Sequence, residues 1–408
     1  MGDDRVIIVG AGPVGAVAAL ALVRHGIPVT LLESENEPAE DQRAATLHPP
    51  TVEIIAALGL EREAFAEDAS GGMRSPLFHF RDRLTGELVA AFDIGLLAGE
   101  VAYPFALQWE QYKLVRAAIP HIERSGIGEV RLASAVTALE QGADHVEVTV
   151  AREGEAERLR GRYVIGCDGG RSTVRRLADI PFEGFTWPER FIKIATTYDF
   201  GATGRGFCTR NYFFDPNEWL NLFQVRGNGP PGIWRGIMPV PPQESDEEAM
   251  SMPAIQRRLQ GIHQKPGDYE IPYHALYAVH QRVAATFNRG RVLLAGDAAH
   301  VNNPIGGMGL NGGIHDAVNL ADKLSALWSG RAETSVLDRY TRQRRKAQID
   351  YVQVQTIQNK RAMEEKDPVI RREHLDELKR ISEDRTLHKQ FLYRASLIDS
   401  LNSANAVA

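Results

Sequence analysis

Apolar residues near the N-terminus follow a pattern that predicts a strand, a turn, a helix and a second strand. Residues 5–9 are β-branched and apolar after Arg5, which is typical of a buried parallel strand. Residues 16–23 are small and apolar and predict a helix, and residues 28–32 predict a strand that ends at Glu33. The uncharged run 6–23 has the length of a membrane span, but an acidic end precedes it and glycines and a proline interrupt it. We therefore expect neither a membrane segment nor a signal peptide there.

The middle of the chain has a different pattern, with short apolar runs separated by turn residues. Such runs predict strands, and they fall at residues 192–200, 209–214, 219–225 and 232–239. Two further runs at residues 77–80 and 88–92 fit the same sheet, and residues 246–259 predict a helix. From residue 337 to about residue 400 the pattern is helical with mixed charge, which indicates solvated faces or a contact in a homodimer. We expect an antiparallel sheet inserted into the first unit.

A glycine cluster separates the first strand from the first helix. The segment reads Gly10-Ala-Gly12-Pro13-Val14-Gly15, and Glu33 follows 18 residues later. In a strand–GxGxxG–helix–strand–acid unit, the first glycine allows the tight turn, the second admits a pyrophosphate and the third lets helix and strand pack closely. The helix N-terminus offers N–H groups to phosphates. Because Glu33 suits an unphosphorylated adenosine ribose, the motif predicts NAD or FAD rather than NADP.

Composition and charge exclude several classes of protein. The 408 residues carry a net charge of −6, which gives no support to nucleic-acid binding. The two cysteines, Cys167 and Cys208, lie too far apart in sequence for a CxxC redox pair and cannot form a disulfide framework or a cysteine-only zinc site. We expect a cytoplasmic protein with no metal site and no membrane partner.

Two further glycine-rich clusters occur later in the chain. The second, at residues 163–175, contains Asp168 and Ser172 after a predicted strand at residues 163–165. The third, at residues 290–320, contains Asp297 after a predicted strand at residues 292–295, and its glycines precede a predicted helix at residues 314–328. In open α/β sheets, ligands bind at the carboxyl ends of the strands, where Asp168 and Asp297 would lie. Ser172 could also be only a helix cap.

These three clusters resemble the motifs of the single-component FAD-dependent aromatic hydroxylases, the group A flavoprotein monooxygenases of para-hydroxybenzoate hydroxylase type. The chain departs from the family pattern at Pro50, where arginine is common, and at Asn303, where a second proline usually precedes Pro304. The resemblance implies a monooxygenase that uses FAD, NADH or NADPH, and O2. It implies hydroxylation of a small phenolic or hydroxypyridine-type ring, with or without a carboxylate, through a flavin C4a-hydroperoxide.

The resemblance also implies roles for individual residues. It places Arg43 on the flavin side and Gln108, before a predicted helix at residues 109–119, near the FAD phosphates. It assigns Asp168 to contacts around FAD and Asp297 to polyol hydroxyls such as the ribityl chain. The backbone of Gly309, Leu310 and Asn311 would face the negative charge of a reduced flavin. For Arg43 a solvated loop charge, and for Gln108 a surface helix start, are the structural alternatives.

Substrate residues are less well defined by the sequence. His48, in the loop after the second strand, is our candidate general base, with Tyr212 as the alternative. The resemblance also implies that Pro304 forms part of the wall near the flavin ring. Several aromatic and polar residues of the inserted sheet are further candidates, and they are Phe214, Gln224 and Trp234. Four arginines could hold a carboxylate or could equally be surface charges, and they are Arg205, Arg210, Arg226 and Arg235.

The fold class that follows is α/β, with a Rossmann-like FAD/NAD(P)-binding domain, an inserted antiparallel-sheet substrate domain and a C-terminal helical tail. We assign residues 1–75, 100–180 and 281–345 to the first domain, residues 76–99 and 181–280 to the second, and residues 346–408 to the tail. Alternative functions on this fold are an epoxidase, an oxidase or a halogenase. A flavin-binding regulator without activity is the alternative outside the enzymes.

Overall fold

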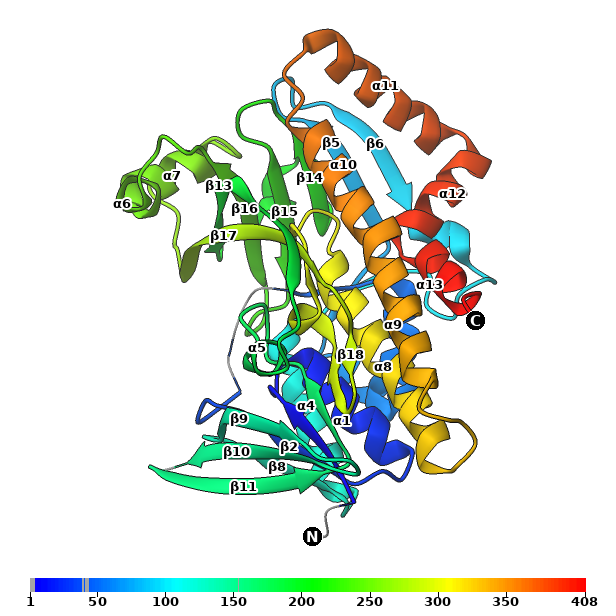
Figure 1. The fold of residues 1–408 in the computed structure, drawn as a ribbon. Coiled ribbons are helices and arrows are strands. Elements are labelled where there is room, and N and C mark those ends of the chain that lie inside the picture. Colours follow the sequence, from blue (N-terminus) through cyan, green and yellow to red (C-terminus); the bar gives the residue numbers. More distant parts are fainter. Residues whose placement is uncertain (1–3, 39, 41–43, 153) are drawn as a thin grey trace.

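A central sheet, parallel except for its edge strand β18, organises the part of the molecule that contains the N-terminus. The computed structural model describes residues 4–38, 40, 44–152 and 154–408 (Figure 1). The sheet has the strand order β18-β19-β12-β1-β2-β8. Its strands are β1 (Val6–Val9), β2 (Val29–Leu32), β8 (Gly128–Arg131), β12 (Tyr163–Gly166), β18 (Asn288–Arg289) and β19 (Val292–Leu294). All four residues of β1 are buried, as expected for a strand covered on both faces.

Helices pack against this sheet and cover its apolar surface. The first helices of the chain are α1 (Pro13–Arg24), α2 (Pro49–Ile55), α3 (Glu61–Ala64), α4 (Gln111–Arg124) and α5 (Thr173–Leu177). Helix α4 begins three residues after Gln108, so the predicted helix start at residue 109 was wrong. Gln108 instead ends the short strand β7 (Ala106–Gln108), which pairs with β3 (Thr46–Leu47) and β4 (Met73–Ser75).

The second large sheet has eight strands, in the order β20-β17-β13-β16-β15-β14-β5-β6. Its strands are β5 (Leu77–Asp82), β6 (Leu88–Asp93), β13 (Phe182–Thr196), β14 (Arg210–Phe214), β15 (Leu220–Val225), β16 (Ile233–Val240), β17 (Tyr273–Ala284) and β20 (His300–Val301). The prediction that residues 77–80 and 88–92 join the inserted sheet is confirmed, because β5 pairs with both β6 and β14. The pairing of β5 with β14 is parallel, so the sheet is mixed rather than antiparallel throughout as predicted. The predicted helix at residues 246–259 is divided at Ser251 into α6 (Asp246–Met250) and α7 (Met252–Gln260).

A separate three-stranded antiparallel sheet lies at one end of the molecule and was missing from the sequence prediction. It consists of β9 (Ala135–Gln141), β10 (Val146–Arg152) and β11 (Glu155–Gly161). Strand β11 is mostly exposed, which weakens the apolar alternation that would have identified it. The sheet lies beside β2 and β8 in Figure 1.

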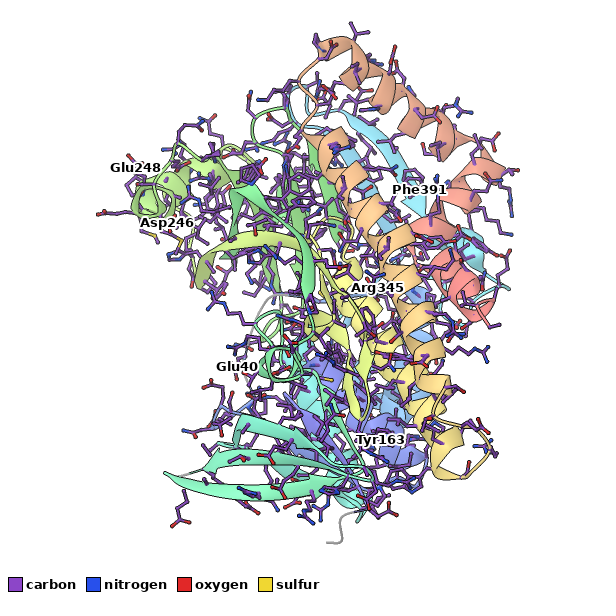
Figure 2. The ribbon with its side chains drawn as sticks, in the orientation of Figure 1. Glu40, Tyr163, Asp246, Glu248, Arg345 and Phe391 are labelled. Carbon is purple, nitrogen blue, oxygen red and sulfur yellow. The ribbon has the colours of Figure 1, made fainter. Side chains whose placement is uncertain are left out.

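The chain from residue 308 onward is mainly helical and lies along both large sheets (Figure 1). Its helices are α8 (Met308–Trp328), α9 (Val336–Lys346), α10 (Val354–Met363), α11 (Pro368–Glu383), α12 (Arg385–Ala395) and α13 (Ile398–Asn405). Phe391 of α12 stacks on Phe92 of β6 with ring centroids 4.2 Å apart (Figure 2). The tail therefore contributes to the core beside the second sheet, in addition to exposing charged faces. Within the described ranges, no helix combines the length and the apolar character that crossing a membrane requires.

Candidate active site

The three glycine-rich clusters meet at one edge of the parallel sheet. Strand β1 pairs in parallel with β12, and β12 pairs in parallel with β19. Each cluster follows the carboxyl end of one of these neighbouring strands. Segments more than 100 residues apart in sequence thus form one continuous edge, which is where open α/β sheets bind ligands.

The glycines at this edge permit contacts that any side chain would prevent. Gly10 has φ +99°, and a Cβ there would lie 2.6 Å from the carbonyl oxygen of Cys167. A Cβ on Gly15 would lie 1.9 Å from the carbonyl oxygen of Gly10, so this glycine lets α1 approach β1. Val14 lies against the third cluster, because added Cβ atoms on Gly296 and Gly313 would be 2.8 and 2.6 Å from its Cγ2 atom.

Gly12 differs from its neighbours because it faces open space. An added Cβ on Gly12 would have no described atom within 4 Å. Gly12 is the N-cap of α1, no side chain caps this helix, and Pro13 occupies its first turn. The cradle fits a pyrophosphate, which needs close backbone approach and free N–H groups at a helix N-terminus. Glu33 lies beside it, where its Oε2 atom accepts a hydrogen bond of 2.8 Å from the Ala11 N–H.

Asp168 shapes the second cluster through hydrogen bonds within its own turn. Its Oδ1 atom accepts from the Ser172 hydroxyl at 2.5 Å, and its Oδ2 atom accepts from the N–H groups of Thr173 and Val174 at 2.7 and 3.1 Å. The Ser172 hydroxyl also accepts from the Arg175 N–H, so Ser172 is the N-cap of α5. A direct contact between Asp168 and FAD stays a prediction.

Asp297 is an exposed carboxylate at the carboxyl end of β19. The turn that carries it is held at both ends by the buried Asp316. The Oδ2 atom of Asp316 accepts from the Gly296 N–H at 3.1 Å and from His300 Nε2 at 2.6 Å. The Oδ1 atom of Asp316 accepts from Arg344 Nε at 2.7 Å. Burial alone would raise the pKa of Asp316, but His300 and Arg344 hold it below its usual range. The carboxylate of Asp316 is therefore charged and fixes the turn of Asp297.

Helix α8 begins at Met308 rather than at residue 314, so Gly309, Leu310 and Asn311 form its first turn. No side chain caps this helix, whose N-cap is Gly307. The Asn311 side chain is buried, accepts from the His48 N–H at 2.8 Å and donates to the Thr46 and Gly307 carbonyl oxygens at 2.8 and 2.6 Å. The backbone N–H groups of the first turn of α8 remain suited to an anionic ligand. The Asn311 side chain joins the third cluster to the segment from β3 to α2.

Gln108 is fully buried, and its Oε1 atom accepts from the Thr46 hydroxyl at 2.9 Å. Its Nε2 atom has no hydrogen-bond partner among the described residues. A contact with the FAD phosphates stays a prediction, as does the role of Arg43, which lies outside the described residues.

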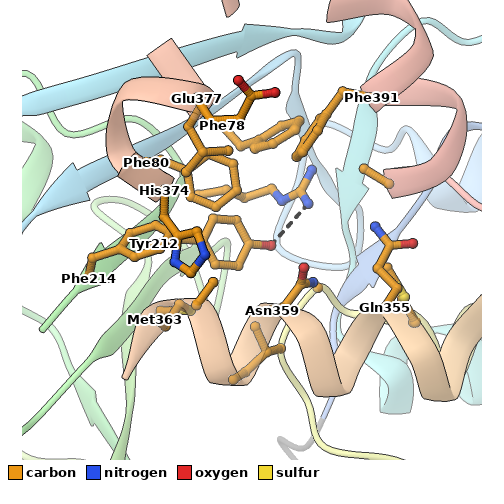
Figure 3. A pocket seen from close by; sticks show the side chains of 17 residues that line it. Phe78, Phe80, Tyr212, Phe214, Gln355, Asn359, Met363, His374, Glu377 and Phe391 are labelled. Carbon is orange, nitrogen blue, oxygen red and sulfur yellow. Dashed lines mark hydrogen bonds between the residues drawn. The ribbon is translucent and has the colours of Figure 1, made fainter. Parts of the chain in front are cut away.

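An apolar cavity of about 220 Å³ lies between the second sheet, the third cluster and the C-terminal helices (Figure 3). Aromatic residues form much of its wall, and they are Phe78, Phe80, Tyr212, Phe214 and Phe391. The loop residues Ile305 and Gly306, together with Met308 at the start of α8, line it from the third cluster. A small concave site with aromatic walls and few polar groups is typical of a pocket for a small molecule.

Arg210 is the cationic residue of this cavity. It is buried beside Phe78, with its guanidinium carbon 5.0 Å from the ring centroid, and its Nη2 atom donates to the Tyr212 hydroxyl at 3.3 Å (Figure 3). Its Nε and Nη1 atoms have no hydrogen-bond partner among the residues described. A buried guanidinium with unused donors can bind a negatively charged oxygen of a ligand.

His48 lies behind the cavity wall. Its Nε2 atom donates to the carbonyl oxygen of Gly306 at 3.0 Å, so the ring bears its proton on Nε2. Burial, together with the charge of Arg210, lowers the pKa of His48 to about 3. The ring is therefore neutral and weakly basic, and its role as general base stays a prediction.

Pro304 precedes the cavity residues Ile305 and Gly306, and its carbonyl oxygen accepts from the Gly307 N–H at 3.1 Å.

Most other substrate candidates do not line this cavity. Trp234 is buried in a different cluster and donates to Asp199 at 3.2 Å, and Gln224 donates to the Pro231 carbonyl at 2.9 Å. Of the four candidate arginines, only Arg210 lines the cavity. Arg205 donates to the Ile262 carbonyl, and Arg226 donates to backbone carbonyls at residues 67, 68 and 72.

Sequence reasoning missed the contribution of the C-terminal helices. They line the cavity with Gln355, Asn359, Ala362, Met363, His374, Glu377, Leu378, Phe391 and Ala395. The repeated spacing of four residues between Gln355, Asn359 and Met363 places them on one face of α10, and this was the available signal. The mixed charge of the tail concealed it.

Comparisons with known proteins agree with this geometry. Residues 3–355 match the family described as FAD binding domain. The chain is 34% identical over 390 residues to a para-nitrophenol 4-monooxygenase of a Pseudomonas species, covering 95% of this chain and 94% of that protein. It is 33% identical over 371 residues to 6-hydroxy-3-succinoylpyridine 3-monooxygenase of Pseudomonas putida, covering 90% of each. The crystal structure of a p-nitrophenol 4-monooxygenase from Pseudomonas putida superposes with a TM-score of 0.91, at 32% identity and 98% coverage of both chains.

The open space at Gly12, the uncapped first turns of α1 and α8 and the exposed Asp297 together fit a dinucleotide with a flavin end. These groups lie along the sheet edge where the three clusters meet, and the cavity adjoins the third cluster. The resemblance proposed from the sequence motifs is thus confirmed by the matched family and by relatives that span nearly the whole chain. The chain belongs to the FAD binding domain family and is an FAD-dependent aromatic-ring monooxygenase of that family.

Proposed function

We propose that this monooxygenase hydroxylates a small phenol or hydroxypyridine that carries a second, oxygen-bearing substituent para to the ring hydroxyl. The observation that carries the proposal is the buried guanidinium of Arg210, whose Nε and Nη1 atoms have no hydrogen-bond partner among the described residues, inside an aromatic cavity next to the Gly306 loop. The two relatives of near-complete coverage support it. By their names, they act on nitrophenol and on a 6-hydroxypyridine with a 3-succinoyl group, and both rings carry their two substituents para to each other.

FAD, when bound, supplies the redox chemistry by accepting electrons from NAD(P)H and activating O2. The residues of this chain then bind and prepare the ring. Arg210 donates hydrogen bonds to the phenol oxygen and favours its phenolate form, because a nearby positive charge lowers the pKa of the phenol. A phenolate is more electron-rich than a phenol and reacts more readily with an electrophilic oxygen.

Tyr212 completes the polar end of the cavity. Its hydroxyl oxygen accepts from Arg210, which leaves its own proton free to donate to the phenolate oxygen or to take part in proton transfer. His48 keeps a structural part in this scheme, because its Nε2–H holds the Gly306 carbonyl and thereby the loop after Pro304. The aromatic wall excludes water from the ring.

The test is a rapid-mixing measurement of flavin reduction by NADH and by NADPH without oxygen. It uses para-substituted phenols and hydroxypyridines, followed by product analysis in air. We expect one class of compound to accelerate flavin reduction and to gain one oxygen atom on the ring, either in place of a ring hydrogen or in place of the para substituent, which is then released. Flavin reduction that no ring compound accelerates would contradict the proposal and favour an oxidase. Oxygen insertion into an alkene would favour an epoxidase, and a halogenated product a halogenase.

We also propose that the protein is cytoplasmic and forms a homodimer. Both cysteines are free in the structure, and free thiols are usual in a reducing compartment. Light scattering of the purified holoenzyme measures the oligomeric state, and a single species of 45.1 kDa would contradict the dimer.

A further inference from the structure

The cavity has two chemically different ends along strand β14. Arg210, Tyr212 and Phe214 alternate along this strand and all line the cavity, so they share one face of the sheet. At about 3.3 Å per residue, Arg210 and Phe214 lie roughly 13 Å apart. Thr209, the residue before Arg210, shares a hydrogen bond of 2.5 Å with Ser75 of β4, and β4 belongs to the same small sheet as β3, whose Thr46 carbonyl accepts from Asn311 of the third cluster. Arg210 therefore marks the end near the third cluster. Phe214 marks the far end.

Helix α10 runs along the cavity in the same direction as β14, from the end near the third cluster to the far end. Near its start, the Thr356 carbonyl accepts from Asn303 of the third cluster at 2.9 Å. At its end, the Met363 carbonyl accepts from the N–H of Asp215, the residue after Phe214, at 3.1 Å. Phe214 and Met363 are thus neighbours at the end that lies away from the third cluster.

Helix α11 brings a histidine to this far end. Arg371 donates to Asp82 and, at 3.5 Å, to the Phe214 carbonyl, which fixes the start of the helix there. One turn later, His374 lines the cavity (Figure 3). Its Nδ1 atom is buried and has no hydrogen-bond partner within the described part of the chain. A buried polar atom without a partner destabilises the protein, so its presence at a cavity wall indicates a ligand partner.

We propose that His374 is a specificity-determining residue that hydrogen-bonds, through Nδ1, the oxygen-bearing substituent para to the ring hydroxyl. This inference rests on the proposed function, in which Arg210 binds the phenolate oxygen at the opposite end. A nitro, carboxylate or keto oxygen accepts a hydrogen bond from Nδ1–H. An apolar group of the same size leaves Nδ1 unpaired.

The test uses the FAD-loaded enzyme and two ligands of similar shape, 4-nitrophenol and 4-isopropylphenol. Ligand dissociation constants are measured from the change in flavin absorbance, and kcat/KM from NAD(P)H oxidation. His374→Leu removes the polar atom. His374→Asn keeps a polar atom near the position of Nδ1. Lys379→Ala, on the exposed part of α11, is the control for effects on the helix.

We expect His374→Leu to raise the dissociation constant of 4-nitrophenol about tenfold and that of 4-isopropylphenol less than about twofold. His374→Asn should recover most of the affinity for 4-nitrophenol, and Lys379→Ala should change neither constant. Equal losses for both ligands, or no recovery with asparagine, would overturn the inference.

The wild-type enzyme separates failure of this inference from failure of the proposed function. If it binds and oxidises 4-nitrophenol but His374→Leu changes nothing, only the role of His374 is overturned. If it binds neither phenol and no para-substituted phenol or hydroxypyridine stimulates NAD(P)H oxidation, the proposed function is overturned and this inference falls with it.

Discussion

Val14 of the first glycine cluster packs directly on Gly313 of the third, since a Cβ added to Gly313 would lie 2.6 Å from Val14 Cγ2. The same Cβ would lie 3.0 Å from the Cα of Gly296. One valine therefore fixes the spacing between α1, α8 and the turn that carries Asp297. The packing of these groups sets the shape of the flavin site before any ligand is bound.

Gly313→Ala should destabilise the protein by about 1–3 kcal/mol, because the added methyl group overpacks a buried contact with backbone on one side. Urea unfolding of the apoprotein measures this loss. The double variant Val14→Ala/Gly313→Ala removes the opposing methyl groups and should recover part of the stability. If the double variant is no more stable than Gly313→Ala, the loss of stability does not come from the contact between the added methyl group and Val14.

Gly12→Ala should leave the stability of the apoprotein within about 0.5 kcal/mol of wild type, because its Cβ meets no described atom. The same Cβ enters the space expected for the pyrophosphate, so the dissociation constant of FAD should rise about tenfold or more. Fluorescence titration of apoprotein with FAD measures this constant. Unchanged FAD affinity would contradict the placement of the phosphates at α1.

The flavin side of the molecule was predictable because each of its elements has a local sequence signal. Glycines at fixed spacing, the buried strands and Asp297 after the third strand are all close in sequence to the features they determine. The side chain of Asn311 was not predictable in the same way. Its partners His48 and Thr46 lie more than 260 residues earlier, and a single sequence gives no signal for such a contact.

Arg210→Met should weaken binding of a phenolic substrate roughly tenfold to 100-fold, as expected when hydrogen bonds to a charged group are lost. The pH at which substrate-stimulated flavin reduction is half-maximal should also move upward, toward the pKa of the free phenol. Arg205→Met is the matched control, because Arg205 donates to the Ile262 carbonyl and does not line the cavity. Equal effects of the two variants would contradict phenolate binding by Arg210.

Acid should destabilise the protein through two buried histidines. Burial lowers the pKa of both His48 and His315 to about 3. The charge of Arg210 adds to this effect at His48, and the charge of Arg344 adds to it at His315. In the unfolded chain both rings bind protons below about pH 6.5, so the unfolded state takes up more protons than the folded state between pH 6.5 and 3. Their contribution to stability is therefore complete above pH 6.5 and decreases as the pH falls.

Unfolding midpoints measured from pH 8 to pH 4 check this dependence. The variant His48→Gln should show a shallower fall than wild type across this range, whereas His25→Gln, at an exposed position, should show the wild-type slope. Parallel curves for all three proteins would contradict the assignment of the acid sensitivity to His48.

Arg344→Met should destabilise the protein by about 3–5 kcal/mol, because it leaves the buried carboxylate of Asp316 without its guanidinium partner. Arg342→Met, at an exposed position on the same helix, is the control and should stay within about 0.5 kcal/mol of wild type. Urea unfolding measures both variants. A small loss for Arg344→Met would show that His300 alone can balance the charge of Asp316.

The substrate side was harder to predict because its residues come from three distant parts of the chain. Arg210 and Tyr212 were singled out in the sequence among many aromatic and basic residues, without a signal that distinguished them. His374 was not singled out at all, because its helix is amphipathic and its neighbours Glu373 and Asp376 are charged and exposed. Only the packing of α11 on the second sheet reveals which face of that helix is turned toward the cavity.

The strand order of the parallel sheet has a consequence for synthesis of the protein. Strand β1 is made first but lies between β2 and β12, and β12 in turn needs β19, which begins at residue 292. A nascent chain growing at about 5–20 residues per second therefore carries an open edge of β1 for about 8–31 seconds, until β12 emerges. The Asp297 turn emerges later still. Cofactor loading is thus a late event, and the ribosome-bound chain spends most of its synthesis without a complete binding site.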